Sequence, residues 1–324
     1  PANMGFCIAC FIRDTVGGLG LHRAAPVQYI RPEIIGLVLG AFLLSFIRGE
    51  HQAKGGSAPM TRFILGFFVM IGCLMFLGCP FRLILRLAGG DWNAILGFVG
   101  FAVGIGAGTF FLKRGYSLKR TYSLPKFDTA VMPVLMVGLL ILVVMAPAFI
   151  FFSEKGPGAV HAFWAVSLIA GIVVGGLAQY TRLCMVGGIR DIILFHETKL
   201  LMGFVAVFVA AFLVNLAFGN FHPGFANQPI AHTDGLWNFL GMALAGFCSI
   251  LLGGCPMRQL IMTGEGNTDS AITVLGLVIG AAFAHNFGLA ASGNGPTFNG
   301  EVAVVLGFVV ALIIAVVNTR KQGA

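Results

Sequence analysis

The chain has 324 residues, of which 58% are apolar and only 10% carry charged side chains. A soluble domain uses about 25% charged residues to cover its surface, so this composition excludes a soluble enzyme and a disordered segment. It also excludes a nucleic-acid-binding domain, despite an excess of eight positive charges. Because the apolar runs lack the alternation of a membrane β-barrel, the sequence predicts an all-α polytopic membrane protein that contacts lipid and no nucleic acid.

Nine windows contain no Lys, Arg, Asp or Glu, and each can hold one membrane-spanning helix of roughly 20 residues. In chain order the windows are Ile34–Ile47, Phe63–Phe81, Trp92–Leu112, Thr129–Ser153, Gly156–Thr181, Leu200–Thr233, Gly235–Met257, Ser270–Gly300 and Val302–Thr319. The first window is short, and we expect Pro32 and Glu33 to extend it. The two longest windows have room for a loop or a break as well as a helix.

The distribution of basic residues predicts how the chain is oriented, because loops rich in Lys and Arg stay in the cytoplasm. The segment 113–126 holds five basic residues and no acid, and the link 48–62 and the C-terminal tail are also basic. The segments 220–234 and 292–301 contain no Lys or Arg and are predicted to be external. We therefore expect a multi-pass protein of the bacterial inner membrane with a cytoplasmic C-terminus.

Two motifs occur twice in the chain. The segment Cys7–Asp14 recurs as Cys184–Asp191, with Cys, Arg and Asp at the same spacing and an offset of 177 residues. The segment Gly78–Arg82, a Gly-Cys-Pro-x-Arg motif, recurs as Gly254–Arg258 at an offset of 176. The chain is therefore predicted to be a duplication.

The duplication divides one integral membrane domain into repeat 1, residues 1–155, and repeat 2, residues 156–324. The loop charges give matched helices opposite directions, which predicts inverted-topology repeats of about five transmembrane helices each. Proteins built in this way have broken or re-entrant helices at the midplane of the membrane. Repeat 2 has a span at 156–181 before its first motif, and repeat 1 has none. We therefore expect one more hydrophobic helix upstream of Pro1.

Six of the seven cysteines form pairs of matched positions: Cys7 with Cys184, Cys73 with Cys248, and Cys79 with Cys255. The seventh, Cys10, is matched by Gly187. A free cysteine often behaves as a small apolar residue, and this is the role we expect for Cys73 and Cys248 within their apolar runs.

Cys79 and Cys255 are the strongest candidates for a functional site. Each follows a glycine (Gly78, Gly254) and precedes a proline (Pro80, Pro256), and these residues break a membrane helix. Such a break is tolerated where it is buried in protein or lines a cavity. A helix that restarts at the proline directs its positive N-terminal end at the cysteine, which favours an anion there.

Arginine in or beside a membrane span is costly and is a candidate functional residue by default. The arginines close to a motif cysteine are Arg13, Arg82, Arg190 and Arg258. The alternative for all of them is snorkelling to the lipid headgroups, which we expect foremost for Arg86 and Arg182. Asp14 and Asp191 each follow an arginine directly and are predicted to pair with it and to end the helix.

The remaining polar candidates leave more than one interpretation open. Cys7-x-x-Cys10 fits a redox or metal pair, or two polarizable contacts at one mouth of a path. The histidines predicted at the surface, in loops or at span edges, are His22, His51, His161, His196, His222 and His232. His285 lies within a span and is a candidate for the path.

At these motifs the sequence resembles the YeeE/YedE family of sulphur-transport membrane proteins. The residues that carry the resemblance are Gln179–Asp191, and Gly253–Arg258 continuing to Gly264–Asn267. The opening segment 3–14 and the Cys-Pro-x-Arg form of both motifs resemble the branch associated with selenium metabolism. The resemblance extends through both repeats.

The resemblance implies the fold of thiosulfate permeases, in which thiols along a central constriction pass a sulphur oxyanion across the membrane. This role carries over best to Cys79 and Cys255 and less closely to Cys7 and Cys184. The proline after the cysteine, the arginine that follows and the extra Cys10 depart from the thiosulfate type. The departures leave open which sulphur or selenium anion is the substrate.

The leading hypothesis is therefore a transporter, not an enzyme, that moves a small sulphur- or selenium-containing anion through a cysteine-lined constriction. The predicted substrate path comprises Cys79, Cys255, Cys7, Cys184, Cys10, Arg13, Arg190, Arg82, Arg258, Pro80, Pro256, Gly78 and Gly254, with no cofactor and no metal. A cytoplasmic sulphur or selenium carrier protein is an expected partner. The rival hypotheses are a membrane-embedded thiol redox protein that uses Cys7 and Cys10, and a soft-metal conductor.

Overall fold

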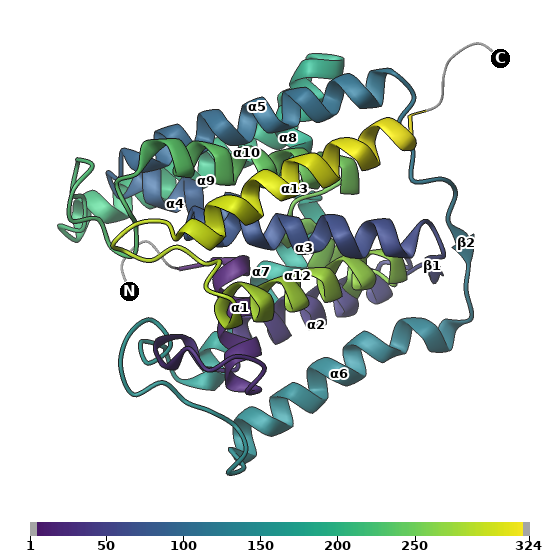
Figure 1. Cartoon of the computed structure of the whole chain (residues 1–324). Helices are drawn as coiled ribbons and strands as arrows, with labels where there is room; N and C mark the ends of the chain where they lie inside the picture. Colours follow the sequence, from purple (N-terminus) through teal and green to yellow (C-terminus); the bar gives the residue numbers. More distant parts are fainter. Residues whose placement is uncertain (1–4, 320–324) are drawn as a thin grey trace.

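The computed structural model describes residues 5–319 and consists almost entirely of α-helices (Figure 1). Within that range the extended structure is one antiparallel pair of two-residue strands, β1 (Lys54–Gly55) and β2 (Tyr122–Ser123), and a few isolated bridges. A short 3-10 turn, η1, covers Ala25–Val27. The all-α architecture predicted from composition is confirmed.

Thirteen α-helices follow one another in the described part of the chain. They are α1 (Ile8–Gly18), α2 (Pro32–Ile47), α3 (Pro59–Met75), α4 (Pro80–Ala88), α5 (Asn93–Lys113), α6 (Lys126–Met145), α7 (Trp164–Thr181), α8 (Met185–Phe195), α9 (Lys199–Ala217), α10 (Gly235–Leu252), α11 (Pro256–Gly264), α12 (Thr268–Asn286) and α13 (Phe298–Val317). Four of them begin at a proline, which lacks the N–H that a first helical turn leaves unpaired.

Nine stretches within residues 5–319 are long and apolar enough to cross a membrane, as the sequence predicted. Three of these stretches contain a break between two helices: Pro59–Ala88, Trp164–Phe195 and Gly235–Gly264. In the two longest sequence windows, Leu200–Thr233 and Ser270–Gly300, the helices α9 and α12 are each followed by a loop. The helix α2 begins at Pro32, which confirms the expected extension of the first window.

The order of helices in residues 8–145 recurs in residues 185–317, α1 to α6 being followed in the same order by α8 to α13. The lengths of the short members also recur, since α1 and α8 have 11 residues each and α4 and α11 have nine each. The helix α7 precedes α8. The symmetry that relates the two halves stays a prediction.

The loops gather at two opposite ends of the molecule. The first, here called the basic end, comprises segments 48–58, 114–125 and 265–267 with residues 318–319. These are joined by backbone hydrogen bonds from Gln52 to Glu265 (3.0 Å) and from Ser117 to Asn318 (3.3 Å). It lies at the right of Figure 1, where β1 and β2 are labelled. The basic segments 48–62 and 113–126, predicted to share one side of the membrane, therefore share one end of the fold, whereas the basic tail residues Arg320 and Lys321 lie outside the described residues.

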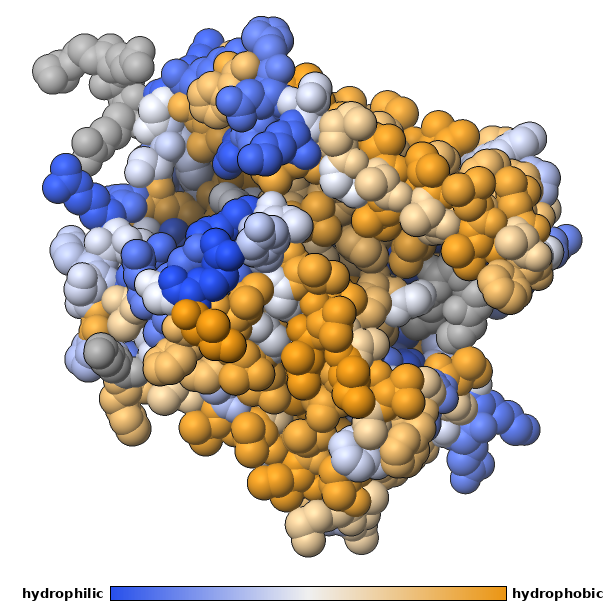
Figure 2. All heavy atoms as spheres, turned by 180° about the vertical axis from the view of Figure 1, so that it is seen from behind, coloured by the Kyte–Doolittle hydropathy of each residue, from blue (hydrophilic) through white to orange (hydrophobic). Residues whose placement is uncertain are grey.

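The opposite end, here called the loop end, comprises segments 19–31, 89–92, 146–163, 219–234 and 287–297. Backbone hydrogen bonds join His222 to Gly89 (2.9 Å) and Ser153 to Gln28 (2.8 Å), and the Asn286 side chain donates to the Leu21 carbonyl (2.8 Å). Both segments predicted to be external, 220–234 and 292–301, begin or lie at this end. On the face seen in Figure 2, apolar residues cover most of the surface between the two ends.

Close helix packing forms the centre of the molecule, where α10 packs on α5 and on α3, and α12 packs on α3. Gly100 and Gly104 of α5 lie directly against backbone carbonyls of α10, and Gly276 of α12 lies against the Phe63 carbonyl of α3. A Cβ at these positions would collide with backbone, so only glycine permits this approach, as is typical of helices packed within membranes. The broken helices are held inside this centre.

Candidate functional site

Four short helices each have a buried cysteine at the N-cap position. The residues at the helix N-caps are Cys7 for α1, Cys79 for α4, Cys184 for α8 and Cys255 for α11. The Cys7 sulphur accepts a hydrogen bond from the backbone N–H of Cys10 (3.3 Å), and the Cys184 sulphur accepts one from Gly187 (3.4 Å). Because the first N–H groups of a helix have no partner within it, each of these starts presents positive charge to a sulphur atom.

The breaks before α4 and α11 follow the same plan in both repeats. Leu77 (φ 61°) and Gly253 (φ 83°) take left-handed conformations that end α3 and α10, and the chain restarts at Pro80 and Pro256. Glycine adopts this conformation without strain, whereas a leucine there costs roughly 1–2 kcal/mol. The prediction that Gly-Cys-Pro breaks the spanning helix is confirmed.

The thiols of repeat 1 meet in one group, here called thiol cluster 1, made of Cys7, Cys10 and Cys79. The sulphur atoms of Cys7 and Cys10 are 2.6 Å apart, and the Cys7 and Cys79 side chains are hydrogen-bonded to each other. The backbone N–H of Ile8 donates to the Cys79 sulphur (3.3 Å). All three thiols are buried, so the N-terminal ends of α1 and α4 meet at a sulphur-lined point inside the protein.

The thiols of repeat 2 form thiol cluster 2, made of Cys184 and Cys255. Their side chains are hydrogen-bonded to each other, and the backbone N–H of Met185 bonds to Cys255, as Ile8 bonds to Cys79. Both cysteines are buried. The structure therefore brings the predicted cysteines together in two groups, one in each repeat.

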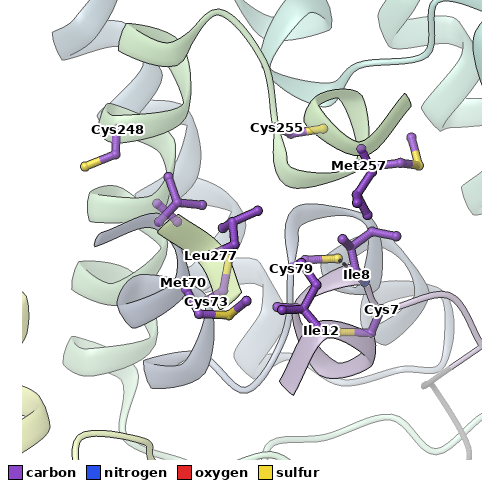
Figure 3. Packing of buried hydrophobic residues seen from close by; sticks show 14 of the residues in the cluster. Cys7, Ile8, Ile12, Met70, Cys73, Cys79, Cys248, Cys255, Met257 and Leu277 are labelled. Atoms are coloured by element: carbon purple, nitrogen blue, oxygen red, sulfur yellow. Dashed lines mark hydrogen bonds between the residues drawn. The ribbon is translucent and has the colours of Figure 1, made fainter. Parts of the chain in front are cut away.

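The two thiol clusters are neighbours. The helices α1 and α11, which follow Cys7 and Cys255, contact each other. In Figure 3, Cys7, Ile8 and Cys79 are drawn together, with Cys255 and Met257 above them. Figure 3 also shows Cys248 away from this group and Cys73 nearer to it, beside Met70. Both are fully buried in the apolar core, as expected of cysteines that act as small apolar residues.

The two motif arginines are held in different ways. The buried guanidinium of Arg82 donates to the carbonyl of Leu77 and to the carbonyls of Pro229 (3.2 Å) and Ile230 (3.3 Å). It therefore ties the break of repeat 1 to the loop between α9 and α10. A Cβ on Gly78 would lie 3.1 Å from the Arg82 side chain, so glycine gives the arginine room to fold back over the break.

Arg258 instead binds a carboxylate. Its two terminal nitrogens donate to the two oxygens of Glu265, each at 3.0 Å. The Arg182 guanidinium lies 4.0 Å from Glu265 and 3.2 Å from Glu50. Gly254 gives Arg258 the same room that Gly78 gives Arg82, since a Cβ there would lie 3.1 Å from the arginine side chain.

The two Arg-Asp pairs of the first motif are also unequal. Asp14 is buried between two guanidinium groups, with Arg13 at 2.7 Å and Arg31 at 2.6 Å. Asp191 pairs with Arg190 at 2.7 Å in a partly exposed position. The predicted pairing is confirmed, but α1 and α8 continue past the aspartates to Gly18 and Phe195, so the prediction that they end the helix is wrong.

Other polar residues lie elsewhere than predicted. Arg86 does not snorkel, because it is fully buried and pairs with Asp91 at 2.6 Å. His22 and His232 are buried rather than at the surface, with a ring nitrogen of each at hydrogen-bond distance from a backbone carbonyl. Loops at the loop end fold back over helix ends and enclose these side chains. His285 packs against the His22 ring, with centroids 4.6 Å apart.

Glu50 and Glu265 are functional candidates that sequence reasoning missed. Glu265 follows Arg258 by seven residues, or two helical turns, a spacing that places the two side chains on one face of a helix. This spacing was the available signal for the pair. Glu50 is brought to Arg182 by tertiary packing alone, because 132 residues separate them.

Within the described residues, no group of three or more His, Cys, Asp or Glu side chains is arranged to hold a metal ion. The soft-metal hypothesis therefore finds no ligand set in that part of the chain. The thiols are arranged instead around helix N-termini.

Residues 180–321 match the model of a family described as sulphur transport. The matched segment contains thiol cluster 2, Arg258 and Glu265. None of the curated proteins matches the chain.

Proposed function

We propose that this protein carries a small sulphur-containing anion, or its selenium analogue, across the bacterial inner membrane, because residues 180–321 match the sulphur transport family and the chain has many apolar spans. The observation that supports this most directly is the meeting of four helix N-termini, each capped by a buried cysteine, in two neighbouring thiol clusters. Helix N-termini of this kind bind anions. The family and the many apolar spans favour transport over catalysis.

The chemistry of the clusters suits a soft, polarizable oxyanion such as thiosulfate. Transfer of an anion from water into a protein interior is costly, and unpaired N–H groups at helix starts lower that cost. A thiol is a weak hydrogen-bond donor, so it contacts the anion without holding it tightly. Several weak sites in series let an ion leave as easily as it enters.

The proposed path runs from the loop end through thiol cluster 1, past Ile8 and Met257, to thiol cluster 2 and the basic end. The helix α4 leads from Cys79 to the loop end, and α11 leads from Cys255 to the basic end. Nine residues of helix rise about 14 Å, which is about half of a 30 Å hydrocarbon core. This length supports a position of both clusters near the middle of the membrane.

The proposed inverted repeat is supported by the course of the chain. The helix α3 starts beside the basic end and leads toward the loop end, whereas its match α10 starts at the loop end. Transporters with inverted repeats place the substrate between the repeats, in discontinuous helices. Each repeat would then supply one half of the path, one leading to the loop end and the other to the basic end. The two halves would meet at the two thiol clusters.

The remaining predicted site residues take supporting roles in this proposal. Gly78 and Gly254 make room for the arginines, and Pro80 and Pro256 restart the helices at the thiols. Arg258 supplies positive charge on the path, and Arg82 holds the break of repeat 1 in shape.

A sulphur or selenium carrier protein is the proposed partner on the cytoplasmic side. The supporting feature is the basic segment 113–126 at the basic end, in which Lys119 and Arg120 are exposed. Complementary charge steers such encounters. The proposal places the C-terminus on this same cytoplasmic side.

Uptake into proteoliposomes tests the proposed function. Radiolabelled thiosulfate and selenite are supplied to the wild type, to Cys79→Ser and Cys255→Ser, and to Cys248→Ser as a matched control outside the path. We expect each path variant to lower uptake about tenfold, the equivalent of one lost interaction of ~1.4 kcal/mol, and the control to retain it. Undiminished uptake in both path variants would overturn the cysteine-lined path.

A thiol redox protein is the second candidate, and the 2.6 Å contact between the Cys7 and Cys10 sulphurs favours it. In this function the two thiols pass two electrons and two protons to a disulfide acceptor, which leaves a Cys7–Cys10 disulfide and two acceptor thiols. Mass spectrometry after exposure to oxidised glutathione tests it. Formation of that disulfide without anion uptake would select the redox function.

A further inference from the structure

Five charged side chains form an ion cluster at the basic end: Arg48, Glu50, Arg182, Arg258 and Glu265. Three guanidinium groups meet two carboxylates there, so the cluster carries one excess positive charge. The shared carboxylate of Glu50 accepts from Arg48 (3.0 Å), Arg182 (3.2 Å) and the Gln179 amide (2.7 Å). The cluster joins the ends of α2, α7 and α11.

The cluster lies between thiol cluster 2 and the surface. Arg258 is three residues beyond Cys255, and Arg182 is two residues before Cys184. Exposure of the side chains rises from 10% for Arg258 and 13% for Glu265 to 54% for Arg182. An anion that leaves Cys255 toward the basic end would therefore meet Arg258 first and Arg182 afterwards.

The contact between Arg258 and Glu265 has the geometry by which arginine binds an oxyanion. Two N–H groups face two oxygens at 3.0 Å each, the fork arrangement that fits a carboxylate and also fits other planar or tetrahedral oxyanions. The Glu265 carboxylate thus fills the place that a free anion would take.

Repeat 1 shows that the motif does not need this acid in order to fold. The residue matched to Glu265 is Gly89, and the matched arginine, Arg82, donates to backbone carbonyls instead. The turn at Cys-Pro-x-Arg has the same backbone plan in both repeats. The acid in repeat 2 therefore has a purpose beyond holding the turn.

The backbone at Arg182 adds a second, independent observation. Arg182 has a φ of 56° at the end of α7, a left-handed conformation that is strained for any residue with a Cβ. Strained residues are retained where the surrounding structure and function require their position. This conformation carries the guanidinium to Glu50 and Glu265.

We propose that Arg258 and Arg182 form an exit-side binding site for a small oxyanion, and that Glu265 occupies it whenever the anion is absent. The arriving anion displaces the carboxylate from Arg258, and the return of Glu265 releases the anion toward Arg182 and the surface. Glu265 is thus a gate that closes the basic end of the path to other anions. The identity of the anion rests on the proposed function, whereas the gate does not.

The test measures how fast Cys255 is modified from the basic end in the reconstituted full chain. A negatively charged and a positively charged methanethiosulfonate reagent are compared on the wild type, Glu265→Gln and a control, Glu301→Gln, and the modified cysteine is identified by mass spectrometry. We expect Glu265→Gln to raise the rate at which the negative reagent modifies Cys255 about tenfold, because the guanidinium of Arg258 is then free to attract an anion. The rate of the positive reagent should stay unchanged. The control should behave as the wild type.

Added thiosulfate should slow the negative reagent in Glu265→Gln, because both anions compete for Arg258. Glu265→Asp keeps the charge on a shorter side chain, so its rate of Cys255 modification by the negative reagent should lie between those of the wild type and Glu265→Gln. It replaces Glu265→Gln in the test if the glutamine variant does not fold. Equal rates in all variants, with uptake of sulphur anions intact, would overturn the gate alone. If the modification rates change as expected but the protein takes up no sulphur anion, the proposed function is overturned and the gate is not.

Discussion

The two thiol clusters share a backbone plan and differ in what surrounds it. In each, a cysteine-capped short helix meets a second helix that restarts at Cys-Pro, and a backbone N–H of the first bonds to the sulphur of the second. Around thiol cluster 1 the arginine is bound by carbonyls and a third thiol is present. Around thiol cluster 2 the arginine is bound by a carboxylate near the surface.

This difference indicates that the two matched motifs, although alike in backbone, differ in role. Arg82 is fully buried and holds loop carbonyls, so it cannot be released without leaving those acceptors unpaired. Arg258 can exchange Glu265 for another anion at a lower cost in free energy. The reason is that Glu265, once released from Arg258, still has the guanidinium of Arg182 within 4.0 Å. In the proposed path, thiol cluster 1 is therefore the rigid half and thiol cluster 2 the half that responds.

The largest expected contrast comes from removing each motif arginine. Arg82→Met leaves the buried carbonyl of Leu77 and the partly buried carbonyls of Pro229 and Ile230 without this donor, and we expect a loss of about 3 kcal/mol in the free energy of unfolding. Arg258→Met should cost less, about 1–2 kcal/mol, because Glu265 still has Arg182 at 4.0 Å as a second positive partner. Thermal unfolding in detergent measures both. Equal losses would contradict the division into a rigid and a responsive half.

A smaller contrast concerns the left-handed residue at each break. Gly253→Ala places a Cβ in open space, since no atom lies within 4 Å, so its cost of about 1 kcal/mol is backbone strain alone. The matched control is Gly106→Ala in the interior of α5, also in open space, where a helical alanine should stabilise by about 0.5–1 kcal/mol. Midpoints of thermal unfolding that move in the same direction for both variants would count against the strain argument.

The smallest expected effect is the pH dependence of the ion cluster. The pKa of Glu50 is lowered from its ordinary value of 4.5, first by the hydrogen bond from Gln179 and then by Arg48. A lowered carboxyl pKa adds stability that is fully present above the ordinary pKa, and this stability is lost as the pH falls from the ordinary pKa through the lowered one. We expect the wild-type unfolding midpoint to be flat from about pH 8 to 6 and to fall below about pH 5. The unfolding midpoint of Glu50→Gln should fall less below pH 5 than that of the wild type. An equal fall in both proteins would show that Glu50 does not cause the pH dependence.

Much of the architecture was predictable from local patterns. Uninterrupted apolar windows predicted nine spans, because a membrane helix must be apolar along its whole length. Gly-Cys-Pro predicted the breaks at Cys79 and Cys255, because proline cannot continue a helix and glycine ends one. The beginnings of α1 and α8 at Cys7 and Cys184 carry no such signal, and only the structure shows them.

The sequence by itself determined that this protein is a helical membrane bundle with two matched sets of motifs and cysteines at its breaks, since composition and spacing act locally along the chain. Only the tertiary structure decided which partners the scarce polar groups take. Arg82 and Arg258 occupy matched positions, yet one meets carbonyls from a loop about 150 residues away and the other meets Glu265. Buried polar groups must find partners wherever packing brings them, and no local pattern specifies that choice.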